Sequence, residues 1–128
     1  MSSTEYQAGV CNIGGAEVKR RQQVAKVGTV FFLVTALYLL FTGASAPSAA
    51  LAAIPAMLAS VGYVQSRKKF CFAFGLLGTF NFAELGRMSK VASKAELAAD
   101  RRMALAIIAQ SMGLALVATL LLAAALSF

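Results

Sequence analysis

Cys11 and Cys71 are the side chains of this sequence best suited to covalent or metal chemistry. Basic residues lie near both, at 19–21 and 67–69, and Cys11 also precedes a predicted helix start. Positive charge and a helix N-terminus both lower the pKa of a thiol and favour the reactive thiolate. Two thiolates on one face could bind a soft metal ion such as Cu(I), or cycle between dithiol and disulfide. The alternative is a packing role, because no CxxC spacing and no histidine accompany the cysteines.

The sequence lacks the residues that several other kinds of catalysis and transport require. The chain has no His, which excludes a Ser-His-Asp triad, a bis-His haem and a His-rich zinc site within it. The long apolar stretches contain no Asp, Glu, Lys or Arg, the usual residues of proton relays, voltage sensors and charged-substrate paths. We therefore predict a protein that is not an enzyme and that carries no cofactor.

Gln110 is the one strongly polar side chain well inside an apolar stretch. An unpaired amide in lipid costs roughly 2–7 kcal/mol, so Gln110 needs a partner. The candidates are Asn81 and a backbone carbonyl freed by Pro55. Either a helix-packing hydrogen bond or a place on a substrate or ion path would account for this residue.

The elements that position these residues are membrane helices. Of 128 residues 59% are apolar and 13% charged, and the mean hydropathy is +0.75. The apolar residues fall in long uncharged runs without the periodicity of half-buried surfaces, which indicates contact with lipid on several sides. We predict an all-α integral membrane helical bundle.

Three stretches are long enough to cross the bilayer, namely residues 27–46, 48–64 and 103–128. Pro47 suits the first turn of the second stretch, whereas Pro55 should kink it. Ser93 and Glu96 have the spacing of a capping box, which predicts that the last helix begins near Ser93. Residues 1–26 and 65–102 would then be polar segments outside the membrane.

The segment 70–82 leaves two topologies open. It is apolar but only about 13 residues long, which is typical of an interfacial or re-entrant segment. If it does not span, the chain has three transmembrane helices, and all twelve basic residues lie on one side, as the positive-inside rule favours. If it spans, the chain has four. Both arrangements place the N-terminus in the cytoplasm, and the membrane would be the inner (cytoplasmic) membrane of a bacterial cell.

Small side chains predict how the helices pack, since close approach supplies the association energy in lipid. The second stretch offers Ala52, Ala56 and Ser60 at four-residue spacing, and the third offers Gly113. We expect the second helix at the centre of the bundle. The same small residues could instead pair two copies of the chain.

The polar segments form a candidate cytoplasmic surface. Besides the two cysteines, its residues are Asn12, Gly14, Glu17, Arg20, Arg21, Arg67, Lys68 and Asn81. Basic clusters at a membrane surface set topology and attract anionic lipid headgroups. We do not expect nucleic-acid binding, because no base-stacking module accompanies the basic residues.

Two motifs in these segments, CNIGGAEVKRR and RKKFCFAFGLLGTFNF, resemble a paired pattern in a family of small multi-pass bacterial membrane proteins with an N-terminal CNIG motif. The resemblance covers most of the chain and implies that location and topology, without an activity, ligand or partner. The residues that carry it are Cys11, Asn12, Ile13, Gly14, Glu17, Arg20, Arg21, Phe70, Cys71, Gly75, Gly78 and Asn81.

Three functions remain open on these grounds. The one that we favour is a non-enzymatic accessory subunit that binds a larger membrane complex or itself. The alternatives are a thiol-based metal or redox protein that uses Cys11 and Cys71, and a small self-associating pore.

Overall fold

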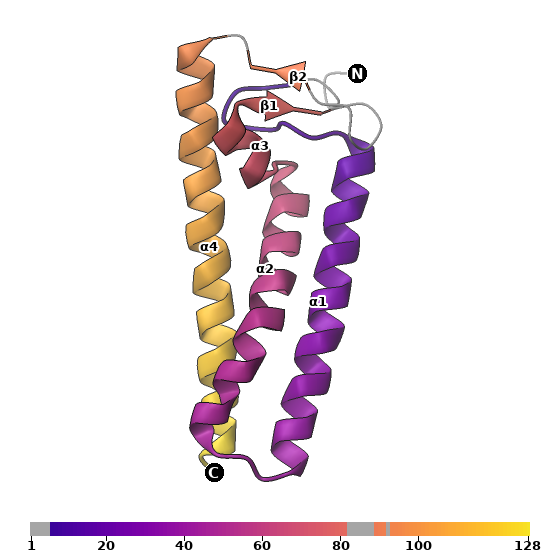
Figure 1. Cartoon of the computed structure of the whole chain (residues 1–128), viewed down its shortest axis with the longest axis vertical. Helices are drawn as coiled ribbons and strands as arrows, with labels where there is room; N and C mark the ends of the chain where they lie inside the picture. Colours follow the sequence, from indigo (N-terminus) through magenta and orange to yellow (C-terminus); the bar gives the residue numbers. More distant parts are fainter. Residues whose placement is uncertain (1–5, 82–88, 92) are drawn as a thin grey trace.

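The computed structural model describes residues 6–81, 89–91 and 93–128. Three long helical segments, each antiparallel to the next along the chain, are closed at one end by a small folded cap (Figure 1). They are α1 (Gly15–Phe41), the 3-10 helix η2 (Ala46–Ala52) that continues into α2 (Ala53–Lys68), and α4 (Lys94–Leu126). Each segment is long and apolar enough to cross a membrane. The predicted all-α bundle with three spanning helices is therefore confirmed.

The helix ends differ from the predicted membrane boundaries. α1 begins at Gly15, twelve residues before the apolar stretch, because the charged residues before Val27 continue the same helix. Pro55, predicted to kink the second stretch, lies in the first turn of α2, two residues after the helix changes from 3-10 to α at Ala53. α4 begins as expected, with the Ser93 side chain accepting a hydrogen bond from the Glu96 amide at 3.1 Å.

The ambiguous segment does not span. It forms the six-residue helix α3 (Phe72–Leu77), a left-handed turn at Gly78 and the strand β1 (Thr79–Phe80), while its predicted last residue, Phe82, lies outside the described residues. β1 pairs antiparallel with β2 (Ser89–Lys90). A helix of this length reaches only about 9 Å, far less than the hydrocarbon thickness of ~30 Å. Of the two topologies, the described fold is the one with three spanning helices.

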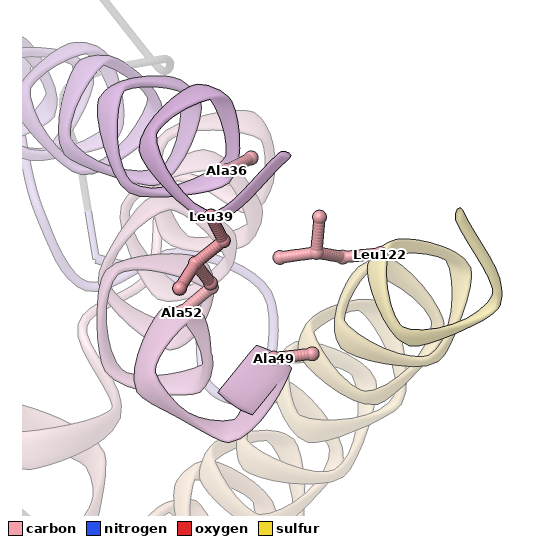
Figure 2. Close-up of a cluster of buried hydrophobic side chains, with 5 residues drawn as sticks. All are labelled: Ala36, Leu39, Ala49, Ala52 and Leu122. Atoms are coloured by element: carbon pink, nitrogen blue, oxygen red, sulfur yellow. The ribbon is translucent and has the colours of Figure 1, made fainter. Parts of the chain in front are cut away.

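α2 lies between α1 and α4 in the bundle, as the small residues predicted (Figure 1). Glycines set the α1–α2 distance: a Cβ added at Gly28 would lie 2.4 Å from the Ala59 amide nitrogen, and one at Gly62 only 2.5 Å from that of Ala25. At the end away from the cap, Leu122 of α4 reaches toward α1 and η2 (Figure 2). The buried residues there are Ala36, Leu39, Ala49, Ala52 and Leu122.

The packing face of α4 differs from the expected one. Ala52 and Ala56 are buried and Ser60 is half-buried, but Gly113 is exposed, and a Cβ added to it would meet nothing within 4 Å. Helical spacing places other residues toward α2, since Ala104, Ile107, Ser111, Ala115 and Leu122 are the buried apolar or small positions of α4. Size alone did not identify this face, because it includes large residues: Ile107 packs with Val64 and Phe70. Leu122 packs with the small residues Ala49 and Ala52.

Candidate functional site

The cap consists of residues 6–14, 69–81 and 89–91, together with the helix turns beneath them, and we call it the polar cap. Asn12, fully buried, is its central residue. Its side-chain oxygen accepts from the Cys71 amide at 2.7 Å, and its side-chain nitrogen donates to the Cys71 carbonyl at 3.1 Å. Its backbone donates to the Lys69 carbonyl and accepts from the Asn81 amide. One residue thus joins the chain before α1 to the chain after α2.

Glu17 and Asn81 extend this network into α1. The Glu17 side chain is buried, with one oxygen accepting from the Asn81 side chain at 3.0 Å and the other from Arg21 at 2.8 Å. The Asn81 carbonyl accepts from the amide of Gly14, the residue that precedes α1, at 2.8 Å. Because Glu17 lies in the first turn of α1, its charge also suits the positive end of the helix dipole.

Arg21 connects the network to Cys71. Its guanidinium donates to Glu17 through one nitrogen and lies 3.0 Å from the Cys71 sulfur through another. The same guanidinium lies 5.9 Å from the centre of the Phe74 ring, within the range of a cation–π contact. These residues line a hollow of about 450 Å³ whose rim carries the exposed Arg20. The Cys71 sulfur is therefore in contact with a cation at this hollow.

Cys11 does not fit the expected reactive thiol. Both cysteines are free and buried. Burial raises the pKa of the Cys11 thiol, and this effect outweighs the lowering by the Gln7 backbone and by the positive charge of Lys69. The expectation of a lowered pKa is therefore wrong for Cys11. Among the residues that the structure describes, no group of three or more His, Cys, Asp or Glu side chains could hold a metal ion.

Tyr6 and Asp100 form a second link that the sequence reasoning missed. Asp100 is fully buried, and its two oxygens accept from the Tyr6 hydroxyl at 2.6 Å and from the Gly9 amide at 2.7 Å. The Tyr6 ring stacks on Phe80 with 4.6 Å between ring centres. The sequence Asp100-Arg101-Arg102 suggests a membrane boundary, and a charge cluster alone gives no sign that the first of its residues is buried.

Gln65 is a further buried polar residue that the sequence did not single out. Its side-chain oxygen accepts from the Phe72 amide at 3.0 Å, and its carbonyl accepts from the Phe70 amide at 3.1 Å. It therefore fixes the turn between α2 and α3. The sequence feature that could have identified Gln65 is the position of a glutamine within one helical turn of the basic residues that end an apolar helix.

The remaining predicted residues lie outside the network. Arg67 and Lys68 end α2, and the Arg67 guanidinium lies 6.0 Å from the centre of the Tyr63 ring. Gln110 is exposed on α4, and within the described part of the chain it makes no hydrogen bond to Asn81 or to a backbone carbonyl of α2. Asn81 bonds to Glu17 in the polar cap. Instead, Gln110 lines a groove together with Arg67 and Lys68.

Comparison of the chain with protein-family models, with curated proteins and with solved structures gave no match.

Proposed function

We propose that this protein is a non-enzymatic accessory subunit of a larger membrane complex, with three crossings of the bacterial inner membrane and its polar cap in the cytoplasm. The observation that carries the proposal is the bonding within the cap. Asn12, Glu17, Arg21 and Asn81 bond to one another and to backbone groups of the cap. Side chains held by these bonds keep the surface of the cap in a fixed shape. A surface with a fixed shape loses little conformational entropy when a partner binds, which favours binding.

The outer surface of the polar cap supports the same proposal. Val10 is 55% exposed and Leu77 is 74% exposed, although both lie on the folded cap outside the long helices. Exposed Lys19, Arg20 and Lys90 belong to the same end of the molecule. Apolar side chains with basic neighbours are suited to a protein partner whose contact surface is apolar and acidic.

Site-specific photo-crosslinking tests this function. A photoreactive residue at Leu77 or Val10, in cells that express the full chain, should give the same discrete crosslinked partner. The matched control is Leu51, which is 67% exposed but lies in η2 at the opposite end. Leu77→Asp should reduce co-purification of that partner in mild detergent. A chain that stays uncrosslinked at both cap positions and runs as a lone monomer would refute the proposal.

A second candidate is a thiol function at Cys71, favoured by the 3.0 Å contact with Arg21. It predicts that the Cys71 thiol in a Cys11→Ser background reacts quickly with a small alkylating reagent. Arg21→Gln should slow the reaction about tenfold if the guanidinium stabilises the thiolate. The control is Arg20→Gln, which removes a neighbouring charge that makes no such contact. Equal rates in all three proteins would leave Cys71 a packing residue.

A further inference from the structure

A groove runs over α2 between α1 and α4, below the polar cap. It consists of two cavities of about 700 and 720 Å³ that adjoin at Tyr63 and Leu114. Small residues of α2 and α4 border it, including Ala59, Ser60 and Gly113. Because α1, α2 and α4 are the spanning helices, most of this groove faces lipid. Each of the two cavities has a volume within the range of roughly 300–1,000 Å³ that is usual for small-molecule sites.

The charge on the groove is confined to one end. Lys26, Arg67 and Lys68 line it, and no acidic residue does. Lys26 is adjacent to Ala25, which packs against Gly62, so all three cations lie within about two helical turns of one another. Arg67 lies over the Tyr63 ring, which keeps its guanidinium at the groove. The lining away from the cap is apolar and includes Val30, Leu114 and Val117.

Gln110 adds a polar group to this apolar lining. It is exposed on α4 at the groove that Arg67 and Lys68 also line. An amide that faces hydrocarbon is costly unless it has a hydrogen-bond partner. In a phospholipid, ester carbonyls follow the phosphate toward the acyl chains, and they accept hydrogen bonds from such an amide. Leu114 and Val117 lie about one and two turns past Gln110 on α4, so the amide precedes this apolar lining as the ester precedes the acyl chain.

We propose that this groove binds an anionic diacyl phospholipid, with the phosphate at Lys26, Arg67 and Lys68 and an acyl chain against Leu114 and Val117. Charge complementarity selects this occupant over a second copy of the chain. Two copies facing each other through the groove would bring like charges together, which disfavours association. The proposal does not depend on the accessory-subunit role, because it concerns the spanning helices and leaves the surface of the polar cap unused.

Native mass spectrometry of the full chain in a neutral detergent tests this site. Phosphatidylglycerol and phosphatidylcholine with the same acyl chains are added in equal amounts, and we expect preferential retention of phosphatidylglycerol. Removing the three groove charges should weaken that binding about tenfold or more, since each cation near a membrane surface contributes about 1 kcal/mol. The variant combines Lys26→Gln, Arg67→Gln and Lys68→Gln. Its matched control removes the same charge from exposed positions at the same end and combines Lys19→Gln, Lys90→Gln and Lys94→Gln.

A second variant fills the groove without changing its charge. Gly113→Phe places a ring where an added Cβ meets nothing within 4 Å, so the bundle can fold as before. We expect it to reduce retention of phosphatidylglycerol about tenfold, because buried apolar contact is lost. If the three groove substitutions and the three control substitutions weakened phosphatidylglycerol binding equally, the lipid would be attracted to the basic end in general. That result would overturn the proposal. Unchanged phosphatidylglycerol binding in Gly113→Phe would also overturn the proposal. A parent chain that is a dimer, and that Gly113→Phe converts to a monomer, would overturn it as well, because the groove would then hold a second copy.

Discussion

The side chain of Asn12 hydrogen-bonds to the backbone of Cys71 in the way that a neighbouring β-strand would. It offers Cys71 both a donor and an acceptor, at 3.1 and 2.7 Å, as a neighbouring backbone would in a β-ladder. Aspartate has the same length but lacks the donor, and glutamine has both groups but is longer. The sequence drew attention to Asn12, Glu17, Arg21 and Asn81 because they flank the apolar stretches. Glu17 and Arg21 have the i,i+4 spacing that a helix brings together, but the bonds of Asn12 and Asn81 join residues more than 50 positions apart and depend on the fold.

Replacing Asn12 tests how much the cap depends on this residue. Asn12→Leu leaves the buried amide of Cys71 without its partner, whereas the Cys71 carbonyl still accepts a hydrogen bond from the Gly75 amide. An unsatisfied buried group costs roughly 1–3 kcal/mol, so we expect the free energy of cap opening to fall by about that amount. Hydrogen exchange at residues 70–75 measures it, with exposed Ser89→Ala as the control. Exchange that stays as slow as in the parent chain would contradict the prediction.

The link between Tyr6 and Asp100 should make the polar cap sensitive to alkali. Burial, and next the hydrogen bond to Asp100, raise the pKa of Tyr6 above its ordinary value of 10.0. A group whose pKa is higher in the folded state stabilises the fold fully below its unfolded pKa, and this contribution is lost as the pH rises toward the folded pKa. Cys11, whose pKa burial also raises, acts in the same direction from its ordinary value of 9.0.

We expect limited proteolysis near the N-terminus to accelerate as the pH rises from 9 to 11. Tyr6→Phe keeps the stacking on Phe80 but removes the ionisable hydroxyl, so its cleavage rate should change less over this range. Tyr63→Phe, which alters an exposed tyrosine of α2, is the control and should behave like the parent chain. An identical pH profile in all three proteins would show that Tyr6 does not govern opening.

Among the elements, α1 and α2 approach most closely, and glycine allows this. Added Cβ atoms at Gly28 and Gly62 would lie under 3.0 Å from backbone atoms of the facing helix. Backbone cannot rotate away as a flexible side chain can, so the helices would have to separate. Gly62 ends the small-residue run of α2 and could be foreseen as a packing position, but Gly28 lies among bulky residues and could not.

Alanine at these glycines should therefore loosen the bundle. We expect Gly28→Ala and Gly62→Ala to lower the thermal unfolding temperature in detergent, followed by circular dichroism, because packing contacts along α1 and α2 are lost. Gly113→Ala is the matched control, since its added Cβ has open space. It should keep or slightly raise the temperature, because alanine favours a helix over glycine by up to about 1 kcal/mol. If Gly113→Ala alone lowered the unfolding temperature, helix packing would depend on Gly113 and not on Gly28 and Gly62.

Local sequence signals predicted some elements better than others. Long apolar runs gave the three spanning segments, and the Ser93 and Glu96 spacing gave the start of α4. The start of α1 was missed because hydropathy reports membrane contact, whereas the helix begins at Gly15 among charged residues. The two-residue strands β1 and β2 are too short to show a periodicity in the sequence, and they are defined by their antiparallel pairing with each other.

For the whole molecule, the placement of charge predicts orientation. The described basic residues belong to the polar cap or to the helix turns nearest it, whereas the C-terminal ends of α1 and α4 lie at the other end (Figure 1). On the basis of the positive-inside rule, we propose that the cap end faces the cytoplasm. The grouping of charge was visible in the sequence, but the gathering of three groups on one end required that residues 70–81 turn back without crossing.

Labelling in intact cells measures this orientation. Single cysteines at Ser45, Ser127 and Ser89, in a chain without Cys11 and Cys71, place an exposed thiol at each end of the bundle. A membrane-impermeant reagent should label the first two and not Ser89, and permeabilised cells should show labelling at all three as the control. Labelling of Ser89 alone in intact cells would mean the opposite orientation.

The bonds of Tyr6 and Gly9 to Asp100 join residues more than 90 positions apart in the sequence. During translation, the N-terminal segment emerges from the ribosome long before Asp100 has been synthesised. The first two spanning helices therefore enter the membrane while the cap is still open, and the start of α4 completes it. A chain stopped before residue 94 would expose the unfinished cap, and proteases that survey newly made membrane proteins could distinguish it from the finished chain by that open end.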